Sequence, residues 1–391
     1  RWSIAHLHQA ILDDEAHVPS IDSFTTLAGY VHWKLTGERV LGVGDASGMF
    51  PIDPATRDYD AAMLDTYAGL VEDRGIDLRA MLPQVLVNGA DAGSLTESGA
   101  ALLDPTGALS AGIPLAPPEG DAGTGMIATN AVAPRTGNVS AGTSIFAMVV
   151  LEGPLASVHE EIDLVTTPAG DLVAMVHCNN GASELGAWAG LFGEFAEALG
   201  SPADADAVFG ALLTRALEAD ADAGGVLAYN TLSGEPIAGL DEGRPLVVRT
   251  PDAGFTLANF MRAQVYGVFG TLSLGMEVLA REGVAIDRMF AHGGIFRTAG
   301  VAQRFLAAAI GAPVAVGDTA SEGGAWGMAV LAAYRQAPLG MDVTTFLDEK
   351  VFAGADVSVV DPVAEDLAGY AAYLERYRKG LAVGRAAVEA I

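Results

Sequence analysis

Residues 117–150, PPEGDAGTGMIATNAVAPRTGNVSAGTSIFAMVV, decide how this chain is organised. Within this stretch Asp121 follows an extended, proline-rich approach and precedes a run of small residues, AGTGMIA. We therefore expect Asp121 at the N-cap of a helix, where backbone can come close to a ligand. A carboxylate in such a place suits a general base.

The second half of the same stretch predicts a hairpin. Residues 138–140 and 145–150 have the composition of two short strands. The turn between them consists of Gly142, Thr143 and Ser144. Such a turn offers successive backbone N–H donors and two hydroxyls, which a nucleotide phosphate needs, although a plain hairpin turn would have the same residues.

The charge balance limits the partners of the protein. The 391 residues include 49 acidic and 21 basic ones, a formal net charge of −28. Nucleic acids and anionic membranes are bound mainly by Lys and Arg, so neither is expected as a partner. Because basic residues are scarce, a phosphate site here would depend on backbone N–H groups and a metal. We interpret the acidic excess itself as solvated carboxylates that favour solubility.

The single cysteine, Cys178, excludes an intrachain disulfide framework and a zinc site of several cysteines. It fits a reducing cytoplasm, which is the location that we expect. No run of 18 apolar residues and no signal segment is present in the sequence, so neither a membrane span nor secretion is predicted. The sequence begins at Arg1 inside a predicted helix over residues 2–12, and we expect that an opening segment has been lost.

The pattern of the chain changes at Pro134. Before it, helices are predicted over residues 23–36, closed by Gly37, and near residues 60–71, with an alternating segment at 84–88. After it, the order becomes strand-first. The predicted strands are the hairpin and residues 172–177, 225–229, 289–292 and 313–316; the predicted helices are 182–199, 203–218, 255–281, 301–310, 323–334 and a tail over 361–391 with three tyrosines. Three strands followed by alternating helices and strands is the order of an actin-like, ribonuclease-H-like nucleotide domain.

Several short blocks, each weak alone, occur in one order across nearly the whole chain. They are residues 34–38 (KLTGE) with 45–48 (DASG), 112–114 (GIP) with 120–122 (GDA), 140–144 (SAGTS), 232–235 (LSGE), Gly293 and Gly294 with Arg297 and Gln303, and 323–329 (GGAWGMA). Together they resemble the FGGY carbohydrate kinases, most closely pentulose kinases such as xylulokinase and ribulokinase. The corresponding family segments are LTGE and DASG, GxPV and GGDNAA, SLGTS, LSGE and GAAxGAA.

The resemblance implies an α/β fold of two actin-like ATPase domains with a cleft between them. Residues 1–133 would form the incomplete, sugar-binding first domain and residues 134–391 the nucleotide-binding second domain. It also implies ATP-dependent phosphorylation of a sugar hydroxyl, with ATP and Mg²⁺ as cofactors and a ketopentose such as xylulose or ribulose as the expected substrate. No metal ligands are assigned.

The resemblance also assigns roles to single residues. Asp121 would contact the substrate and accept its hydroxyl proton, against the alternative that it only caps a helix. Gly142, Thr143 and Ser144 would hold phosphate. Gly293, Gly294 and Arg297 would contact the nucleotide, against a plain strand-to-helix turn.

The sequence departs from the family pattern in three places. The family's opening Asp-x-Gly-Thr phosphate turn has no counterpart here, so the chain alone is expected to be a poor or inactive kinase. Ala122 stands where the family has Asn, and Glu119 stands where it has Gly, which would add a negative charge beside Asp121. These departures leave open a non-catalytic ATP- or sugar-binding module of the same fold. An actin-like assembly protein is disfavoured by the Asp121 segment, and a homodimer is left open.

Overall fold

A seven-stranded mixed sheet organises the second part of the computed structural model, which describes residues 2–317 and 323–391. Its strand order is β13-β12-β11-β5-β6-β8-β7. Strand β11 runs parallel to both β12 and β5, and the other neighbouring pairs are antiparallel. The strands are β5 (Thr136–Ala141), β6 (Ile145–Val150), β7 (Asp163–Thr166), β8 (Leu172–Cys178), β11 (Arg288–His292), β12 (Val314–Gly317) and β13 (Val357–Val360). A separate antiparallel pair joins β9 (Leu227–Tyr229) to β10 (Leu246–Val248).

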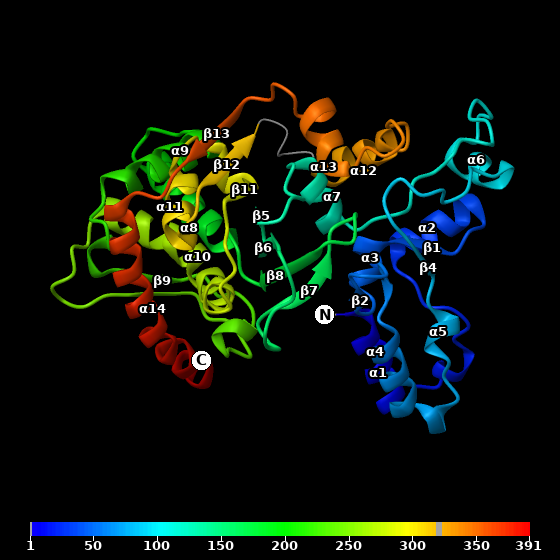
Figure 1. The fold of residues 1–391 in the computed structure, drawn as a ribbon. Coiled ribbons are helices and arrows are strands. Elements are labelled where there is room, and N and C mark those ends of the chain that lie inside the picture. The colour runs from blue at the N-terminus through cyan, green and yellow to red at the C-terminus, as the bar shows by residue number, and fades with distance from the viewer. Residues whose placement is uncertain (1, 318–322) are drawn as a thin grey trace.

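Helices cover both faces of this sheet because its strands alternate apolar side chains between two cores. Val139 and Ala147 face the larger core, whereas Met148 and Val150 face the smaller one. The larger core is covered by α8 (Ser183–Ala198), α9 (Ala205–Arg215), α10 (Leu257–Arg281), α11 (Val301–Ile310) and α14 (Ala364–Ala390). The smaller core is covered by α7 (Asp121–Ala128), α12 (Gly323–Tyr334) and α13 (Val343–Phe346), which leads into a π-helical turn at Leu347–Val351. Figure 1 shows α7 and α12 side by side at the border of the two parts of the molecule.

Helix α10 is buried on nearly all sides, which explains why most of its residues are apolar or small. Tyr370, Tyr373 and Tyr377 of α14 pack against it, as the spacing in the tail predicted. The layer also holds a buried ion-pair network: Asp366 is 1% exposed and accepts hydrogen bonds from both Arg262 and Arg304. This network joins α14 to α10 and α11.

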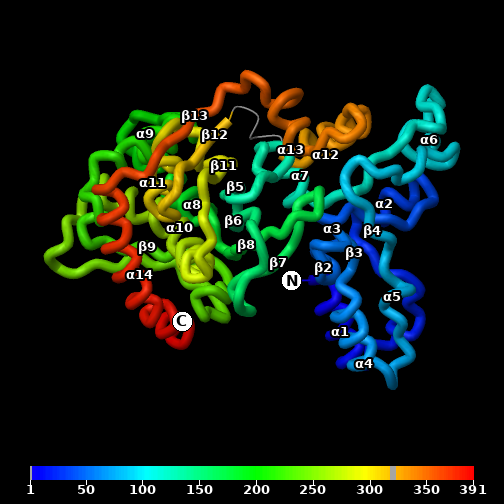
Figure 2. The backbone as a smooth tube through the Cα atoms, viewed as in Figure 1, coloured from blue at the N-terminus to red at the C-terminus, as the bar shows by residue number. Residues whose placement is uncertain are grey.

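The first part of the chain forms a smaller body, visible as the blue and cyan region in Figure 2. Its described helices are α1 (Ser3–Leu12), α2 (Leu27–Thr36), α3 (Val43–Ser47), α4 (Ala61–Leu70), α5 (Leu78–Met81) and α6 (Glu97–Leu103). Strand β1 (Val40–Gly42) pairs in parallel with β4 (Gln84–Leu86), and β2 (Ile52–Asp53) pairs with β3 (Asp58–Tyr59). The domain boundary expected at residues 131–137 stays a prediction.

Most predicted elements are confirmed within two or three residues, and the differences have local causes. The helix predicted over 23–36 begins only at Leu27, because the Thr26 hydroxyl accepts the Gly29 N–H and caps it there. Gly37 closes the same helix in a left-handed conformation, as predicted. Strands β7 and β13 were not predicted. In the part of the chain that the structure describes, no helix combines the length and apolar character needed to span a bilayer.

Candidate functional site

A pocket of about 810 Å³ lies between the first part of the chain and α12. Leu27, Val31 and Leu35 of α2 form one wall, and Met328 and Ala332 of α12 form the opposite wall. Its described lining includes no Lys or Arg. Its acidic side chains come from α3 and from the approach to α7: Asp45, Glu119 and Asp121. The pocket is thus an apolar cleft with carboxyl groups gathered in it.

Asp121 is the first residue of α7, and its neighbour Gly120 occupies the N-cap. The expectation that Asp121 is the cap itself is therefore wrong by one residue, because the extended backbone continues through Gly120. The Asp121 side chain is exposed and makes no hydrogen bond to any residue that the structure describes. Its carboxylate is free to act on a ligand in the pocket, which a capping carboxylate would not be.

Asp45, by contrast, is held firmly. The Thr26 hydroxyl donates a 2.6 Å hydrogen bond to its Oδ2. Its Oδ1 accepts no bond within the described residues and lies next to Gly120, where an added Cβ would come within 3.1 Å of it. Burial raises the pKa of Asp45, the nearby charge of Asp121 raises it further, and the bond from Thr26 opposes both. Sequence reasoning missed this residue, although it opens the DASG block.

Glu119 does not act as an extra charge beside the base in the way that the sequence predicted. It is 9% exposed, and its two oxygens accept the backbone N–H groups of Gly44 at 3.2 Å and Asp45 at 2.8 Å. Burial, followed by the neighbouring Asp45 charge, raises its pKa to about 8 against the pull of these two bonds. Near neutral pH it is therefore mostly protonated. Its two hydrogen bonds connect α3 to the segment that precedes α7.

The two predicted nucleotide segments meet at one end of the sheet. Gly142, Thr143 and Ser144 connect β5 to β6, as predicted, and Gly293 and Gly294 follow β11. Gly293 has a φ of 120°, and a Cβ there would lie 2.1 Å from the carbonyl oxygen of Ala141. Only glycine permits this approach, which brings the two segments into contact.

The turn fits a phosphate group. The Gly142 N–H is used by the carbonyl of Ser144, but the N–H groups of Thr143 and Ser144 bond no acceptor in the described residues. Thr143 is exposed and Ser144 half-buried, so two amides and two hydroxyls remain available. Arg297, in the turn after Gly294, is exposed and forms no ion pair with a described residue. Gly294 has open space beside its Cα, which leaves room for a flat ring against the backbone.

Asp121 lies toward the same end of the sheet as this turn. Helix α7 leads into β5 through a short connection, and Gly125 in the middle of the helix lies beside Asn138 in the middle of the strand, at 3.6 Å from the position of an added Cβ. The helix and the strand therefore run side by side in opposite directions, and the start of α7 lies toward the end of β5. The carboxylate and the phosphate-sized turn therefore lie toward the same end of the sheet.

Helix α12 crosses α7 at very close range. A Cβ at Gly327 would lie 1.9 Å from the carbonyl oxygen of Thr124. Glycine at position 327 is therefore required for this packing, because a larger side chain at the crossing would separate the helices. This contact fixes Met328 and Ala332 against the pocket that contains Asp121.

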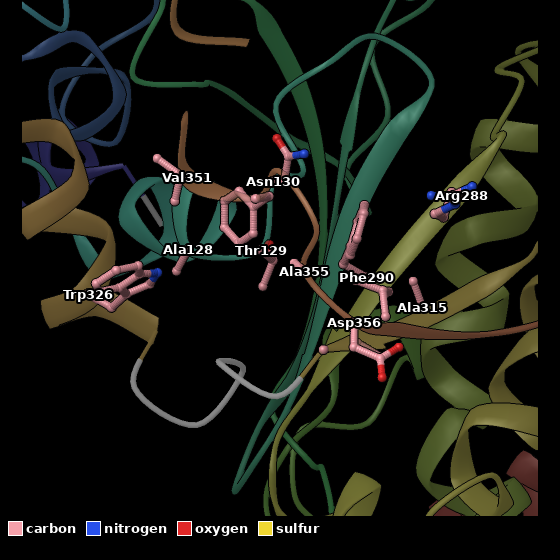
Figure 3. Close-up of a pocket in the computed structure, with 14 residues that line it drawn as sticks. Ala128, Thr129, Asn130, Arg288, Phe290, Ala315, Trp326, Val351, Ala355 and Asp356 are labelled. Carbon is pink, nitrogen blue, oxygen red and sulfur yellow. The ribbon is translucent and has the colours of Figure 1, made fainter. Parts of the chain in front are cut away.

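A second cavity, of about 350 Å³, lies behind α7 and away from this cleft. Figure 3 shows Ala128, Thr129 and Trp326 on one side of it and Phe290, Ala315 and Arg288 of the sheet on the other. Thr129 already bonds the carbonyl of Gly125, and Asn130 bonds Asp348 at 2.7 Å. None of the predicted site residues lines this cavity.

A protein-only metal site is not found. Among the described residues, no group of three His, Cys, Asp or Glu side chains is placed to hold an ion. Mg²⁺ commonly uses only one or two carboxylates together with phosphate oxygens and water. The residues present would therefore fit Mg²⁺ only if a bound nucleotide supplied most of its ligands.

Comparison with known proteins agrees with this geometry. Residues 137–335 match the sequence profile of the C-terminal domain of the FGGY family of carbohydrate kinases. This match covers the hairpin, the glycine pair after β11 and α12, which are the same segments that build the second part of the site. No curated protein sequence matches the chain.

Solved structures of similar fold include several kinases. The chain is 18% identical to a ligand-bound xylulose kinase from Lactobacillus acidophilus, with a TM-score of 0.78 over 99% of this chain and 74% of that one. The chain is 19% identical to a gluconate kinase from the same organism, with a TM-score of 0.77 over 99% of this chain and 73% of that one. It is 21% identical to a xylulose kinase from Rhodospirillum rubrum, with a TM-score of 0.73 over 98% of this chain and 71% of that one. The chain thus shares their two-part α/β fold and spans nearly three quarters of their length.

Proposed function

Since this chain belongs to the FGGY family of carbohydrate kinases, we propose that it transfers the γ-phosphoryl group of ATP to a sugar hydroxyl, with Asp121 as the general base. The observation that carries the proposal is the free carboxylate of Asp121 in the cleft, at the same end of the sheet as the open amides of Thr143 and Ser144. Phosphoryl transfer asks a protein mainly for alignment, charge stabilisation and one proton acceptor, and these three are what the cleft offers.

In the reaction, Asp121 accepts the proton of the sugar hydroxyl as the oxygen forms its bond to phosphorus and the bond to the leaving ADP oxygen breaks. ATP supplies the phosphoryl group, and Mg²⁺ would neutralise phosphate charge. The residues of this chain hold the reactants: Thr143 and Ser144 donate to phosphate oxygens, and Gly293 and Gly294 leave room for the nucleoside against the backbone.

A ketopentose such as xylulose or ribulose is the substrate that we propose, from the resemblance of the sequence blocks to those of pentulose kinases. The second candidate is a non-catalytic ATP- or sugar-binding module of the same fold. It is left open by the departures of the sequence from the family pattern, where Ala122 stands in place of Asn and Glu119 in place of Gly. A homodimer and a cytoplasmic location also stay predictions.

The test is ATP-dependent phosphorylation by the protein as its gene encodes it, with a panel of pentuloses, hexuloses, polyols and aldonates. ADP release is followed beside calorimetric binding of each sugar and of ATP. The kinase proposal expects sugar-dependent ADP release that is greatest with a pentulose. Binding of ATP and sugar without turnover on any acceptor would instead establish the binding module.

A further inference from the structure

The second carboxylate of the cleft has no part in the mechanism above, yet it is built like a recognition group. We propose that Asp45 is a specificity-determining residue, whose free Oδ1 accepts a hydrogen bond from the sugar hydroxyl next to the one that Asp121 deprotonates. The site would then select a neutral acceptor with two adjacent hydroxyls and reject acidic sugars. This inference rests on the proposed function and names the substrate class of the same site.

The first step of the argument is the fixed position of Asp45. Thr26 holds Oδ2 at 2.6 Å, and Thr26 is itself fixed because its oxygen accepts the Gly29 N–H at the start of α2. From the other side, Glu119 holds the backbone N–H of Asp45 at 2.8 Å. A carboxylate held by its neighbours in this way loses little freedom when it binds a ligand, which is the condition for a recognition group.

The second step is the direction of the remaining oxygen. Oδ1 lies beside Gly120, immediately before Asp121, and both carboxylates line the same pocket. No described residue donates to Oδ1 or to the Asp121 carboxylate. Asp45 Oδ1 and the Asp121 carboxylate are thus two unpaired acceptors in one cleft. They fit two hydroxyl donors on adjacent carbons of one ligand.

The third step concerns charge. Besides the buried Glu119 carboxyl, the described lining of the pocket holds the carboxylates of Asp45 and Asp121 and no Lys or Arg. A carboxylate-bearing acceptor would meet like charge with no cation to compensate it, whereas the hydroxyls of a neutral sugar would gain charge-assisted hydrogen bonds. The lining therefore favours a ketose or polyol over an aldonate of the same length.

The test uses Asp45→Asn, in which the amide oxygen can still accept the Thr26 proton while an NH₂ group replaces the free acceptor. The ligands are xylulose, its mono-deoxy analogues with one hydroxyl removed at a time, and xylonate. Loss of a hydrogen bond to a charged group corresponds to roughly a ten- to hundredfold change in Kd. We expect the variant to bind xylulose more weakly by that factor, mainly through Kd and KM, with kcat changing far less.

The deoxy analogues locate the contact. In the unmodified protein, removal of one particular hydroxyl should weaken binding by about the same ten- to hundredfold factor, and in Asp45→Asn the same removal should cost less than about threefold. The unmodified protein should bind xylonate at least about tenfold more weakly than xylulose, and the ratio of the two Kd values should be smaller in the variant. Asp22→Asn is the matched control: it removes one charge from an 86% exposed carboxylate of the same part, outside the pocket, and should leave all constants unchanged.

The outcomes separate this inference from the proposed function. Three results would each overturn the role of Asp45. The first is unchanged sugar binding in Asp45→Asn, and the second is a loss of affinity for each deoxy analogue that is as large in the variant as in the unmodified protein. The third is equal binding of xylonate and xylulose. Sugar binding with the expected coupling but without phosphorylation would support Asp45 and reject the kinase proposal. Failure of every sugar to bind would overturn both.

Discussion

Replacing Glu119 by Gln should change how stability depends on pH. The carboxyl group is buried, bonds the N–H groups of Gly44 and Asp45, and has a pKa raised from 4.5 to about 8. In the unfolded chain it would lose its proton near its ordinary pKa, so between the two values the folded state binds more protons. The free energy of unfolding must therefore fall as pH rises through this window, and it levels off above the folded pKa.

The size of the effect follows from the shift. One pKa unit corresponds to about 1.36 kcal/mol, so the protein should lose roughly 3 to 4 kcal/mol between pH 5 and 8 from this group alone. Gln cannot ionise, and it offers one acceptor oxygen where Glu offers two. The variant should thus be less stable by about 1 kcal/mol at pH 5, through the weaker bond to Gly44, and more stable than the unmodified protein at pH 8.

Urea unfolding of both proteins at pH 5, 6, 7, 8 and 9 measures this directly. The difference between the two proteins removes the contribution of other titrating groups that the substitution leaves unchanged. The two curves should cross between pH 5 and 8. Parallel curves, or an unmodified protein that becomes more stable relative to the Glu119→Gln variant as pH rises, would refute the burial argument for this carboxyl.

Three further substitutions probe other parts of the molecule. Thr143→Ala should weaken ATP binding by about 1–3 kcal/mol in calorimetry while sugar binding is kept, and equal ATP affinity would remove Thr143 from the site. Asp366→Asn should lower the free energy of unfolding by about 3–5 kcal/mol, because the buried Arg262 loses its charged partner; a loss below about 1 kcal/mol in urea would contradict this. Gly327→Ala should destabilise by at least about 1–3 kcal/mol in thermal melts, since the new Cβ would collide with the Thr124 carbonyl, and an unchanged Tm would show that the helices are not in contact.

Elements with strong local signals could be predicted from the sequence. Helix α11 begins and ends where its apolar periodicity and flanking glycines indicated, and α12 has the bounds that its small-residue run predicted. The β5–β6 hairpin was visible because two strand-like segments flank the turn residues Gly142, Thr143 and Ser144. Local composition decides such elements, since their caps and turns lie within a few residues.

What the sequence did not reveal depends on contacts between distant residues. Strands β7 and β13 are short edge strands whose pairing partners, not their own composition, define them. Glu119 reads as an added charge beside Asp121 until the structure shows it bonded to α3, 74 residues away in the chain. Asp45 was likewise missed, because nothing in its local sequence shows that Thr26 bonds one oxygen and that the other lies beside Gly120.

Steady-state phosphorylation by Asp121→Asn tests the central claim most directly. The Asp121 side chain is exposed and unbonded, so the change should leave Tm nearly the same while it removes the proton acceptor. General-base catalysis contributes about a hundred- to ten-thousandfold in rate, and kcat on the best sugar should fall by that order with sugar binding largely retained. A variant that turns over like the unmodified protein would show that Asp121 is not the base.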